Sequence, residues 1–268
     1  ESDVVIAVLG LDAGIEGEEG DAGNEYGSGD KPDLNLPGLQ EEILEAAVSC
    51  GKPVVLVLLS GSALAVSWAD EHVDAIIQGW YPGARGGAAI ADILFGEANP
   101  EGKLPVTFYR TTEELPEFEN YSMKGRTYRY MKQEALYPFG YGLSYTEYTY
   151  QNIRFLEQRP KTSDGVTIGV SVKNTGKMDG IETVQVYVKA EHSDMPYGQL
   201  KKIVKLPLHA GEEKEIHIRL EPEAFMMYDE KGKKILPSGN FRIFVGGMQP
   251  DMRSERLAGK TVKSLILE

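Results

Sequence analysis

Short apolar runs alternate with segments of helical period over the first hundred residues. Residues 4–9 and 54–59 are entirely apolar, which is typical of strands in a parallel sheet covered on both faces. Between these runs, Pro37 suits the first turn of a helix and Gly51 suits its end. The apolar residues that recur there at helical spacing are Leu39, Ile43, Leu44, Ala47 and Val48.

The same alternation continues beyond the second run. The pattern predicts a short helix over 69–73, a third strand over 75–77, a helix over 86–95 and a fourth strand over 104–108. Strands that alternate with helices at short intervals favour a parallel βαβ sheet. Ligands of such sheets bind beyond the carboxyl ends of the strands.

From about Tyr150 onward, apolar residues recur at every second position. Residues 166–172, 184–188, 216–220 and 241–245 each alternate apolar with other positions, and turn residues separate them. This predicts an antiparallel β-sandwich with a structural or binding role. The connector over 111–149 keeps neither period, and we expect its tyrosines to pack domains together rather than line a site. The aromatic residues concerned are Tyr128, Tyr130, Tyr137, Phe139, Tyr141 and Tyr145.

An acidic loop follows the first apolar run. This segment, residues 16–38 (EGEEGDAGNEYGSGDKPDLNLPG), is here called the acidic loop. Its first part, residues 16–21, places four carboxylates in a window without Lys or Arg. They are Glu16, Glu18, Glu19 and Asp21. Crowded carboxylates raise the pKa of at least one member, as a general acid requires. Composition alone favours a solvated loop, and the window matches neither a nucleotide nor a calcium motif.

The net charge and composition of the chain limit the classes of partner that it can bind. The chain has 28 Lys and Arg against 41 Asp and Glu, a net charge of −13, which argues against nucleic acid and membrane partners. Cys50 is the only cysteine and the four histidines have no ligand spacing, so we expect no metal site. The 268 residues suffice for two domains. The lone cysteine and the lack of a visible leader favour the cytoplasm without excluding secretion, and the opening at Glu1 suggests part of a larger protein.

An ordered series of motifs resembles the C-terminal part of glycoside hydrolase family 3, the β-glucosidase and β-xylosidase group. The series covers nearly the whole chain. Its members are the acidic loop after Gly10-Leu11, Asp30-Lys31, and residues 34–40 (LNLPGLQ), 80–87 (WYPGARGG), 94–96 (LFG), 99–105 (NPEGKLP), 137–146 (YPFGYGLSYT), 172–176 (VKNTG) and 185–188 (QVYV).

The resemblance implies an α/β and all-β architecture. Residues 1–110 would be the later part of an α/β sandwich with a mostly parallel sheet, 111–149 a connector, and 150–268 an Ig-like, fibronectin type III-like β-sandwich. The family's (β/α)8 barrel, which carries the aspartate nucleophile, is absent. We therefore expect the isolated chain to be inactive without that partner domain.

The resemblance also implies a retaining mechanism without metal or cofactor, in which one carboxyl group attacks and the other donates a proton. It assigns the general acid/base to Glu18, with Glu19 as the alternative. The sequence departs from the family pattern at three points: it has two adjacent glutamates, an insertion before Asp30, and Lys31 in place of arginine. Trp68 and Trp80 suit the core or a domain interface better than sugar stacking, so we leave them out of the site.

The function so predicted is hydrolysis of terminal non-reducing β-D-glucosyl residues from a β-glucoside or oligosaccharide. A β-xylosidase of the same family is the alternative, and a non-catalytic carbohydrate-binding or scaffolding module is another. An α/β enzyme acting alone is the least favoured, because no Ser/His/Asp or Cys/His constellation is present. Substrate-binding residues stay unassigned, and homo-oligomerisation stays open.

Overall fold

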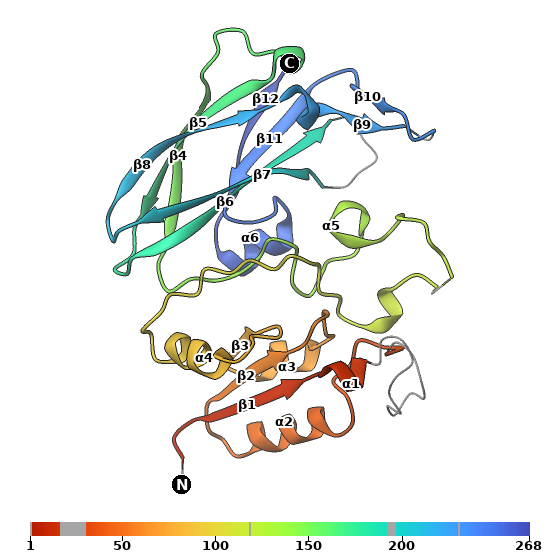
Figure 1. The fold of residues 1–268 in the computed structure, drawn as a ribbon, viewed down its shortest axis with the longest axis vertical. Helices are drawn as coiled ribbons and strands as arrows, with labels where there is room; N and C mark the ends of the chain where they lie inside the picture. Colours follow the sequence, from red (N-terminus) through yellow and green to blue (C-terminus); the bar gives the residue numbers. More distant parts are fainter. Residues whose placement is uncertain (1, 17–30, 118, 192–196, 230) are drawn as a thin grey trace. The chain divides into compact units, whose positions relative to one another are not determined.

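The chain forms two compact units. The computed structural model describes residues 2–16, 31–117, 119–191, 197–229 and 231–268 (Figure 1). The first unit combines Glu1–Glu97 with Phe108–Tyr121, and the second combines Ala98–Thr107 with Ser122–Glu268. These units are compact bodies rather than family domains, so the boundaries expected at 110 and 149 stay a prediction.

A parallel three-stranded sheet forms the centre of the first unit. Its strands are β1 (Val5–Gly10), β2 (Val54–Leu59) and β3 (Ala75–Gln78), in the order β1-β2-β3. Because β2 has a neighbour on each side, its residues Leu56, Val57 and Leu58 are almost completely buried. The predicted parallel α/β arrangement is confirmed.

Within the described residues, four α-helices connect or follow these strands. They are α1 (Ala13–Glu16), α2 (Gln40–Ser49), α3 (Ser67–His72) and α4 (Gly86–Leu94). Helix α2 packs along β1 and fully buries Leu44, the residue at the centre of its apolar stripe. The helices predicted near residues 39–48, 69–73 and 86–95 are confirmed, with ends that differ by one or two residues.

Strand β1 is not covered on both faces, contrary to the expectation from its apolar run. Ile6 and Val8 are 47% and 54% exposed. They alternate with the half-buried Val5, Ala7 and Leu9. None of the described elements buries the face of β1 that carries Ile6 and Val8, and β1 is also the end strand of the sheet.

The fourth strand predicted over 104–108 is wrong. Residues up to Thr107 belong to the second unit, and Leu104 pairs there with irregular backbone. Its N–H donates to the Tyr141 carbonyl at 2.8 Å, and its carbonyl accepts from the Gly140 N–H at 2.7 Å. Pro105 follows directly and has no N–H, which prevents a longer ladder on that side.

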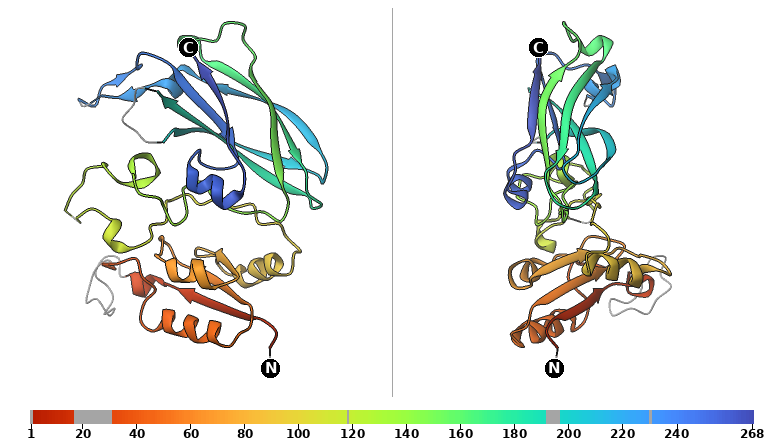
Figure 2. Two further views of the ribbon diagram at one scale, coloured as in Figure 1. Left: turned by 180° about the vertical axis from the view of Figure 1, so that it is seen from behind. Right: turned by 90° about the vertical axis from the view of Figure 1, so that its left-hand side faces the viewer.

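Two antiparallel sheets build the second unit (Figure 2). One has the order β12-β11-β6-β7 and the other β4-β5-β8. The strands are β4 (Tyr148–Phe155), β5 (Val166–Asn174), β6 (Gly180–Ala190), β7 (Gln199–Leu208), β8 (Glu213–Leu220), β11 (Phe241–Gly246) and β12 (Lys263–Leu267). A small hairpin pairs β9 (Met227–Tyr228) with β10 (Lys234–Ile235).

The core of this unit lies between the two sheets. Alternate residues of the central strands are completely buried. They are Val166, Ile168, Val170 and Val172 on β5, Val184 and Val186 on β6, and Ile243 and Val245 on β11. The predicted antiparallel sandwich is confirmed. The sequence pattern did not predict four other elements, because their polar and apolar residues follow no clear period. They are β4, β7, β12 and helix α6 (Met252–Ala258).

The aromatic connector is mostly irregular. It contains the short helices η2 (Thr112–Glu114) and α5 (Thr127–Tyr130); two similar turns, η3 (Thr162–Asp164) and η4 (Pro222–Phe225), lie further on. Tyr128 stacks on Phe139 with ring centroids 4.2 Å apart and meets the edge of Tyr187 on β6. These rings pack the connector onto the sandwich. None of the described helices has the length and apolar character to cross a bilayer.

Gly10 allows β1 and β2 to end side by side, and its replacement tests that role. Its φ is +137°, and a Cβ there would lie 2.0 Å from the Leu59 carbonyl oxygen. We expect Gly10→Ala to destabilise the first unit by roughly 2 kcal/mol or more. Because both tryptophans, Trp68 and Trp80, lie in this unit, denaturant titration followed by tryptophan fluorescence measures the effect.

Gly87→Ala is the matched control. This glycine lies in α4, its φ is outside the left-handed region, and a Cβ would meet no atom within 4 Å. The substitution should be neutral or stabilise by up to about 1 kcal/mol. Equal effects of the two substitutions would contradict the steric role of Gly10.

Candidate active site

The carboxyl ends of β1, β2 and β3 meet at one edge of the sheet. The segments that leave this edge begin at Leu11, Ser60 and Gly79. The first leads through α1 into the acidic loop, so the acidic loop begins where ligands of parallel sheets bind.

Gln40 holds the end of β1 from the start of α2. Its Oε1 accepts the Gly10 N–H at 2.7 Å, and its Nε2 donates to the Gly10 carbonyl at 2.9 Å. One amide side chain thus satisfies both backbone polar groups of a residue that has reached the end of its ladder. This contact fixes the exit of the chain toward the acidic loop.

Glu16, the last residue of α1, connects the acidic loop to the next segment of the edge. Its Oε1 accepts from the Gly61 N–H at 3.1 Å and from the Ser62 hydroxyl at 3.2 Å. The Tyr81 hydroxyl also bonds to this carboxylate; burial, followed by the bond to Glu16, raises the pKa of Tyr81 to about 12. Glu16 is therefore an anchor between three segments of the chain.

The turn that Glu16 contacts is itself fixed from within. Ser60 is completely buried, and its hydroxyl donates to the Ser62 carbonyl at 2.7 Å and accepts from Gln78 Nε2 at 3.1 Å. The Gln78 Oε1 is buried and has no hydrogen-bond partner within the described ranges. The ends of β2 and β3 are thus joined by side chains as well as by backbone.

The far side of the acidic loop is held at Lys31 and Leu34. Lys31 Nζ donates to the Asp33 carbonyl at 2.7 Å and pairs with the Asp33 carboxylate, and the Lys31 side chain is only 6% exposed. The Leu34 N–H donates to Thr112 Oγ1, while its carbonyl accepts the Ala65 N–H. Both ends of the acidic loop are therefore anchored to the first unit.

The candidate acid/base residues lie between these anchors. Glu18 and the alternative Glu19 fall within 17–30, outside the described residues, so their assignment stays a prediction. Of the four clustered carboxylates, Glu16 is the one the structure describes, and it is occupied in hydrogen bonding to Gly61 and Ser62. Sequence reasoning missed its partner Tyr81, whose one signal was its position just after the third apolar run.

The tryptophans pack against neighbours in the first unit. Trp80 meets the edge of Phe108 with ring centroids 6.2 Å apart, and Trp68 stacks on His72 at 4.3 Å. Trp80 has a φ of +54°, a left-handed conformation that is uncommon for a large side chain. Both rings thus have aromatic neighbours within this unit, and their exclusion from the site stays a prediction.

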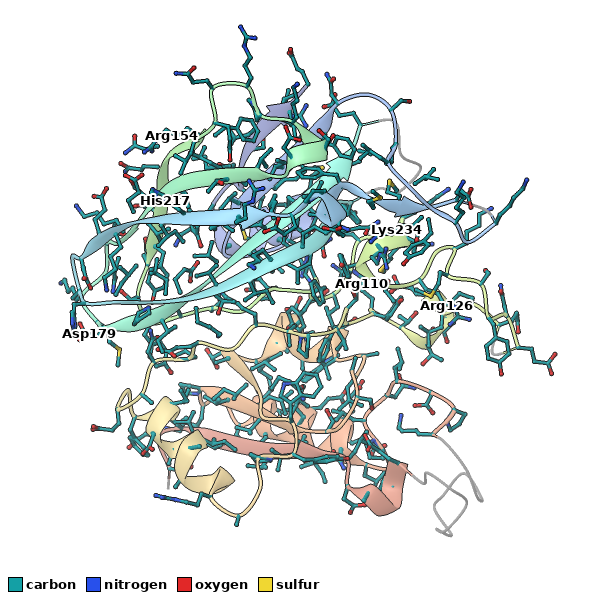
Figure 3. The ribbon with its side chains drawn as sticks, turned by 45° about the horizontal axis from the view of Figure 1, so that its top comes forward. Arg110, Arg126, Arg154, Asp179, His217 and Lys234 are labelled. Atoms are coloured by element: carbon teal, nitrogen blue, oxygen red, sulfur yellow. The ribbon has the colours of Figure 1, made fainter. Side chains whose placement is uncertain are left out.

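The described histidines have ordinary surface partners. Figure 3 labels His217 and Arg154, which both bond to Glu215 on the outer side of the β4-β5-β8 sheet. His209 bonds to Asp179, and this bond raises the pKa of the imidazole. No group of three or more metal-ligating side chains occurs in the part of the chain that the structure describes.

Known proteins resemble this chain over nearly all of its length. A xylan 1,4-β-xylosidase of Xylanibacter ruminicola is 39% identical over 94% of the chain, and a periplasmic β-glucosidase of Salmonella typhimurium is 35% identical over 92%. The solved β-glucosidase of Erythrobacter marinus superposes with a TM-score of 0.80 at 33% identity and covers 99% of the chain. The chain spans 29%, 33% and 34% of these three proteins, about a third of their length.

Family models agree with these relatives. Residues 182–249 match the fibronectin type III-like domain, in the sandwich of the second unit. Residues 1–145 match the glycosyl hydrolase family 3 C-terminal domain. Since that match covers more than half of the 268 residues, the chain belongs to glycoside hydrolase family 3.

Proposed function

We propose that this chain supplies the general acid/base carboxyl of a retaining β-glycosidase that releases terminal non-reducing β-D-glucosyl residues. The observation that carries the proposal is the double anchoring of the acidic loop. Glu16 ties its start to Gly61, Ser62 and Tyr81, and Leu34 ties its end to Thr112 and Ala65. A proton donor must be held within hydrogen-bond reach of the departing oxygen.

In this mechanism Glu18 protonates the glycosidic oxygen as the bond to the anomeric carbon breaks. The same residue, now a carboxylate, removes a proton from the water that releases the sugar. Glu19 is the alternative donor. The nucleophile and most sugar contacts would come from a (β/α)8 barrel. Such a partner domain is supported by the lengths of the relatives, since this chain spans only about a third of each.

A β-xylosidase of the same family is the second candidate function. The xylan 1,4-β-xylosidase of Xylanibacter ruminicola is 39% identical to this chain, whereas the Salmonella typhimurium β-glucosidase is 35% identical. The solved β-glucosidase of Erythrobacter marinus, at 33% identity, favours the glucosidase. Parallel assays on 4-nitrophenyl β-D-glucoside and β-D-xyloside separate the two.

The isolated 268-residue chain should not hydrolyse aryl β-glucosides. It would hold only one of the two required carboxyl groups, so release of 4-nitrophenol should stay at the level of a Glu18→Gln, Glu19→Gln double variant. Turnover clearly above that level would contradict the division of the active site between this chain and a barrel.

Substitution of the proton donor should slow hydrolysis most for substrates whose leaving group needs a proton to depart. In the full-length enzyme we expect Glu18→Gln to lower kcat/KM about 100-fold to 10,000-fold on alkyl or disaccharide substrates. The loss should be far smaller on 2,4-dinitrophenyl glycosides, whose leaving group departs without a proton. If Glu19→Gln gives this pattern and Glu18→Gln does not, Glu19 is the donor.

Substitution of Glu16 should affect activity differently from substitution of Glu18, because Glu16 anchors the acidic loop. Glu16→Ala removes the acceptor for Gly61 and Ser62, and we expect kcat to fall on the order of tenfold for all leaving groups. Glu16→Gln keeps a carbonyl acceptor and should retain most of the activity. A selective loss on poor leaving groups in Glu16→Gln would instead identify Glu16 as the acid.

A further inference from the structure

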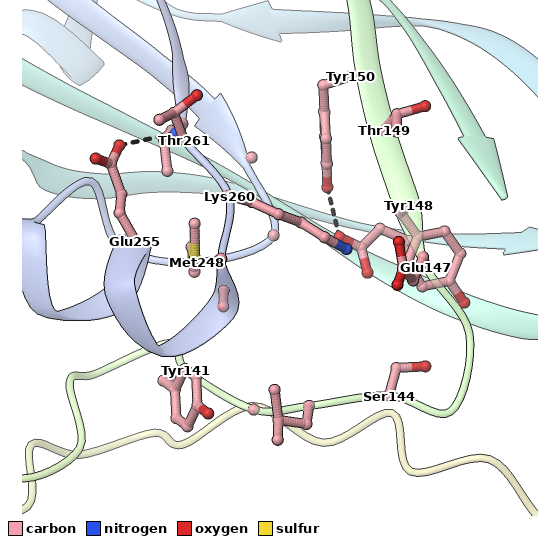
Figure 4. Close-up of a pocket in the computed structure, with 18 of the residues that line it drawn as sticks. Tyr141, Ser144, Glu147, Tyr148, Thr149, Tyr150, Met248, Glu255, Lys260 and Thr261 are labelled. Carbon is pink, nitrogen blue, oxygen red and sulfur yellow. Dashed lines mark hydrogen bonds between the residues drawn. The ribbon is translucent and has the colours of Figure 1, made fainter. Parts of the chain in front are cut away.

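A pocket of about 890 Å³ opens in the second unit beside strands β4 and β12 (Figure 4). Both strands lie at the ends of their sheets, so the pocket occupies an open side of the sandwich. Residues 141–144 and 146–151, the turn after β11 and helix α6 contribute to its wall. Its volume falls within the range of about 300–1,000 Å³ that is usual for small-molecule sites.

Polar side chains reach the inner part of the pocket. Glu182 on β6 is 5% exposed, and its Oε1 accepts from the Tyr150 hydroxyl at 2.7 Å. Burial, reinforced by Glu182, raises the pKa of the Tyr150 phenol well above its usual value, so this proton stays in place at neutral pH. Lys103 donates to the Gly142 carbonyl, and Lys260 extends toward the Tyr150 hydroxyl (Figure 4).

The charges that line the pocket nearly cancel. Its carboxylates are Glu147, Glu182 and Glu255, and its cations are Lys103, Arg256, Lys260 and Lys263. A near balance of fixed charges gives neither an anion nor a cation a large electrostatic gain. The lining therefore suits a neutral ligand that both donates and accepts hydrogen bonds.

The rim of the pocket is apolar and exposed. Leu143 is 62% exposed and Met252 is 73% exposed, and the ring of Tyr141 lies on the same wall. Thr149 also lines the pocket, and its buried Oγ1 has no partner in the described part of the chain. Apolar and aromatic surface combined with a few placed polar groups is the usual composition of a small-molecule site.

An added β-strand is a poorer occupant than a small molecule. The register of β4 with β5 shifts between Gln151 and Arg154, and Asn152 within this bulge has a φ of +54°. A bulge interrupts the row of N–H and C=O groups that an incoming strand would need.

We propose that this pocket binds a short neutral oligosaccharide, at a carbohydrate site formed by the second unit alone. Sugar rings present C–H faces that can lie on the apolar rim, and hydroxyl groups that can bond to Glu182, Lys260 and Thr149. The inference stands on the pocket itself and does not depend on which glutamate of the acidic loop is the proton donor.

Titration of the 268-residue chain with cellotriose and xylotriose tests the proposal. Calorimetry should give saturable binding of at least one trisaccharide, and amide shifts in ¹H–¹⁵N spectra should concentrate at residues 148–151 and 260–262. Trigalacturonate and triglucosamine, which are anionic and cationic, should bind at least tenfold more weakly. Absence of saturable binding by either neutral trisaccharide, or tighter binding of a charged one, would overturn the inference.

Variants at the rim provide the matched comparison. Leu143→Arg places bulk and charge at the mouth without disturbing the core, and should weaken binding at least tenfold; Met252→Arg should act alike. Ile203→Arg, on β7 at 52% exposure and outside the pocket, should bind as the unsubstituted chain does. Unchanged binding by both rim variants, or equal loss in Ile203→Arg, would contradict the proposed site.

A Glu18→Gln, Glu19→Gln double variant separates this inference from the catalytic proposal. We expect it to bind the trisaccharide with unchanged affinity, because the pocket is built from residues of the second unit. Loss of binding in this variant would assign the sugar to the acidic loop and overturn the pocket proposal, whereas the catalytic proposal would survive.

Discussion

Parallel pairing of β1 with β2 is the constraint on which the position of the acidic loop depends. The register runs from Val5 opposite Val54 to Gly10 opposite Leu59. At its last step only a glycine fits, because a side chain would meet the Leu59 carbonyl at 2.0 Å. Gln40 then bonds to both backbone groups of Gly10. The chain therefore leaves the sheet at one defined point, next to the turn at residues 60–62.

Polar side chains have different tasks in the two units. In the first unit, Glu16, Ser60 and Gln40 lie at the carboxyl edge of the sheet, where they join segments that the backbone ladder no longer holds. In the second unit, the sandwich core is apolar, and the buried Glu182 and the partly buried Tyr150 lie beside its open side. Burial of such groups is tolerated because each bonds to the other. The family assignment depends on neither of these two groups of polar side chains, since the family motifs are spread over the whole chain.

Sequence patterns predicted the elements whose burial is regular. Apolar residues occupy every second position over 166–172 in β5, 184–188 in β6 and 241–245 in β11, and α2 repeats its apolar residues with helical period. Strand β7 reads QLKKIVKLPL and has no such alternation, because an edge strand of a sandwich is only partly covered. The run over 104–108 was apolar enough to be taken as a strand, but its backbone pairs with residues 140–141.

The sequence by itself determined the family motifs, the two kinds of sheet and the acidic loop that carries the candidate acid/base residues. These are local properties, since periodicity and motifs are read from neighbouring residues. The tertiary structure decided which residues anchor the acidic loop. Glu16 bonds to Gly61 across 45 positions of sequence, and Gln40 bonds to Gly10 across 30. Such partners meet only because β1 and β2 pair in parallel and end at the same edge, a relation that no single stretch of sequence contains.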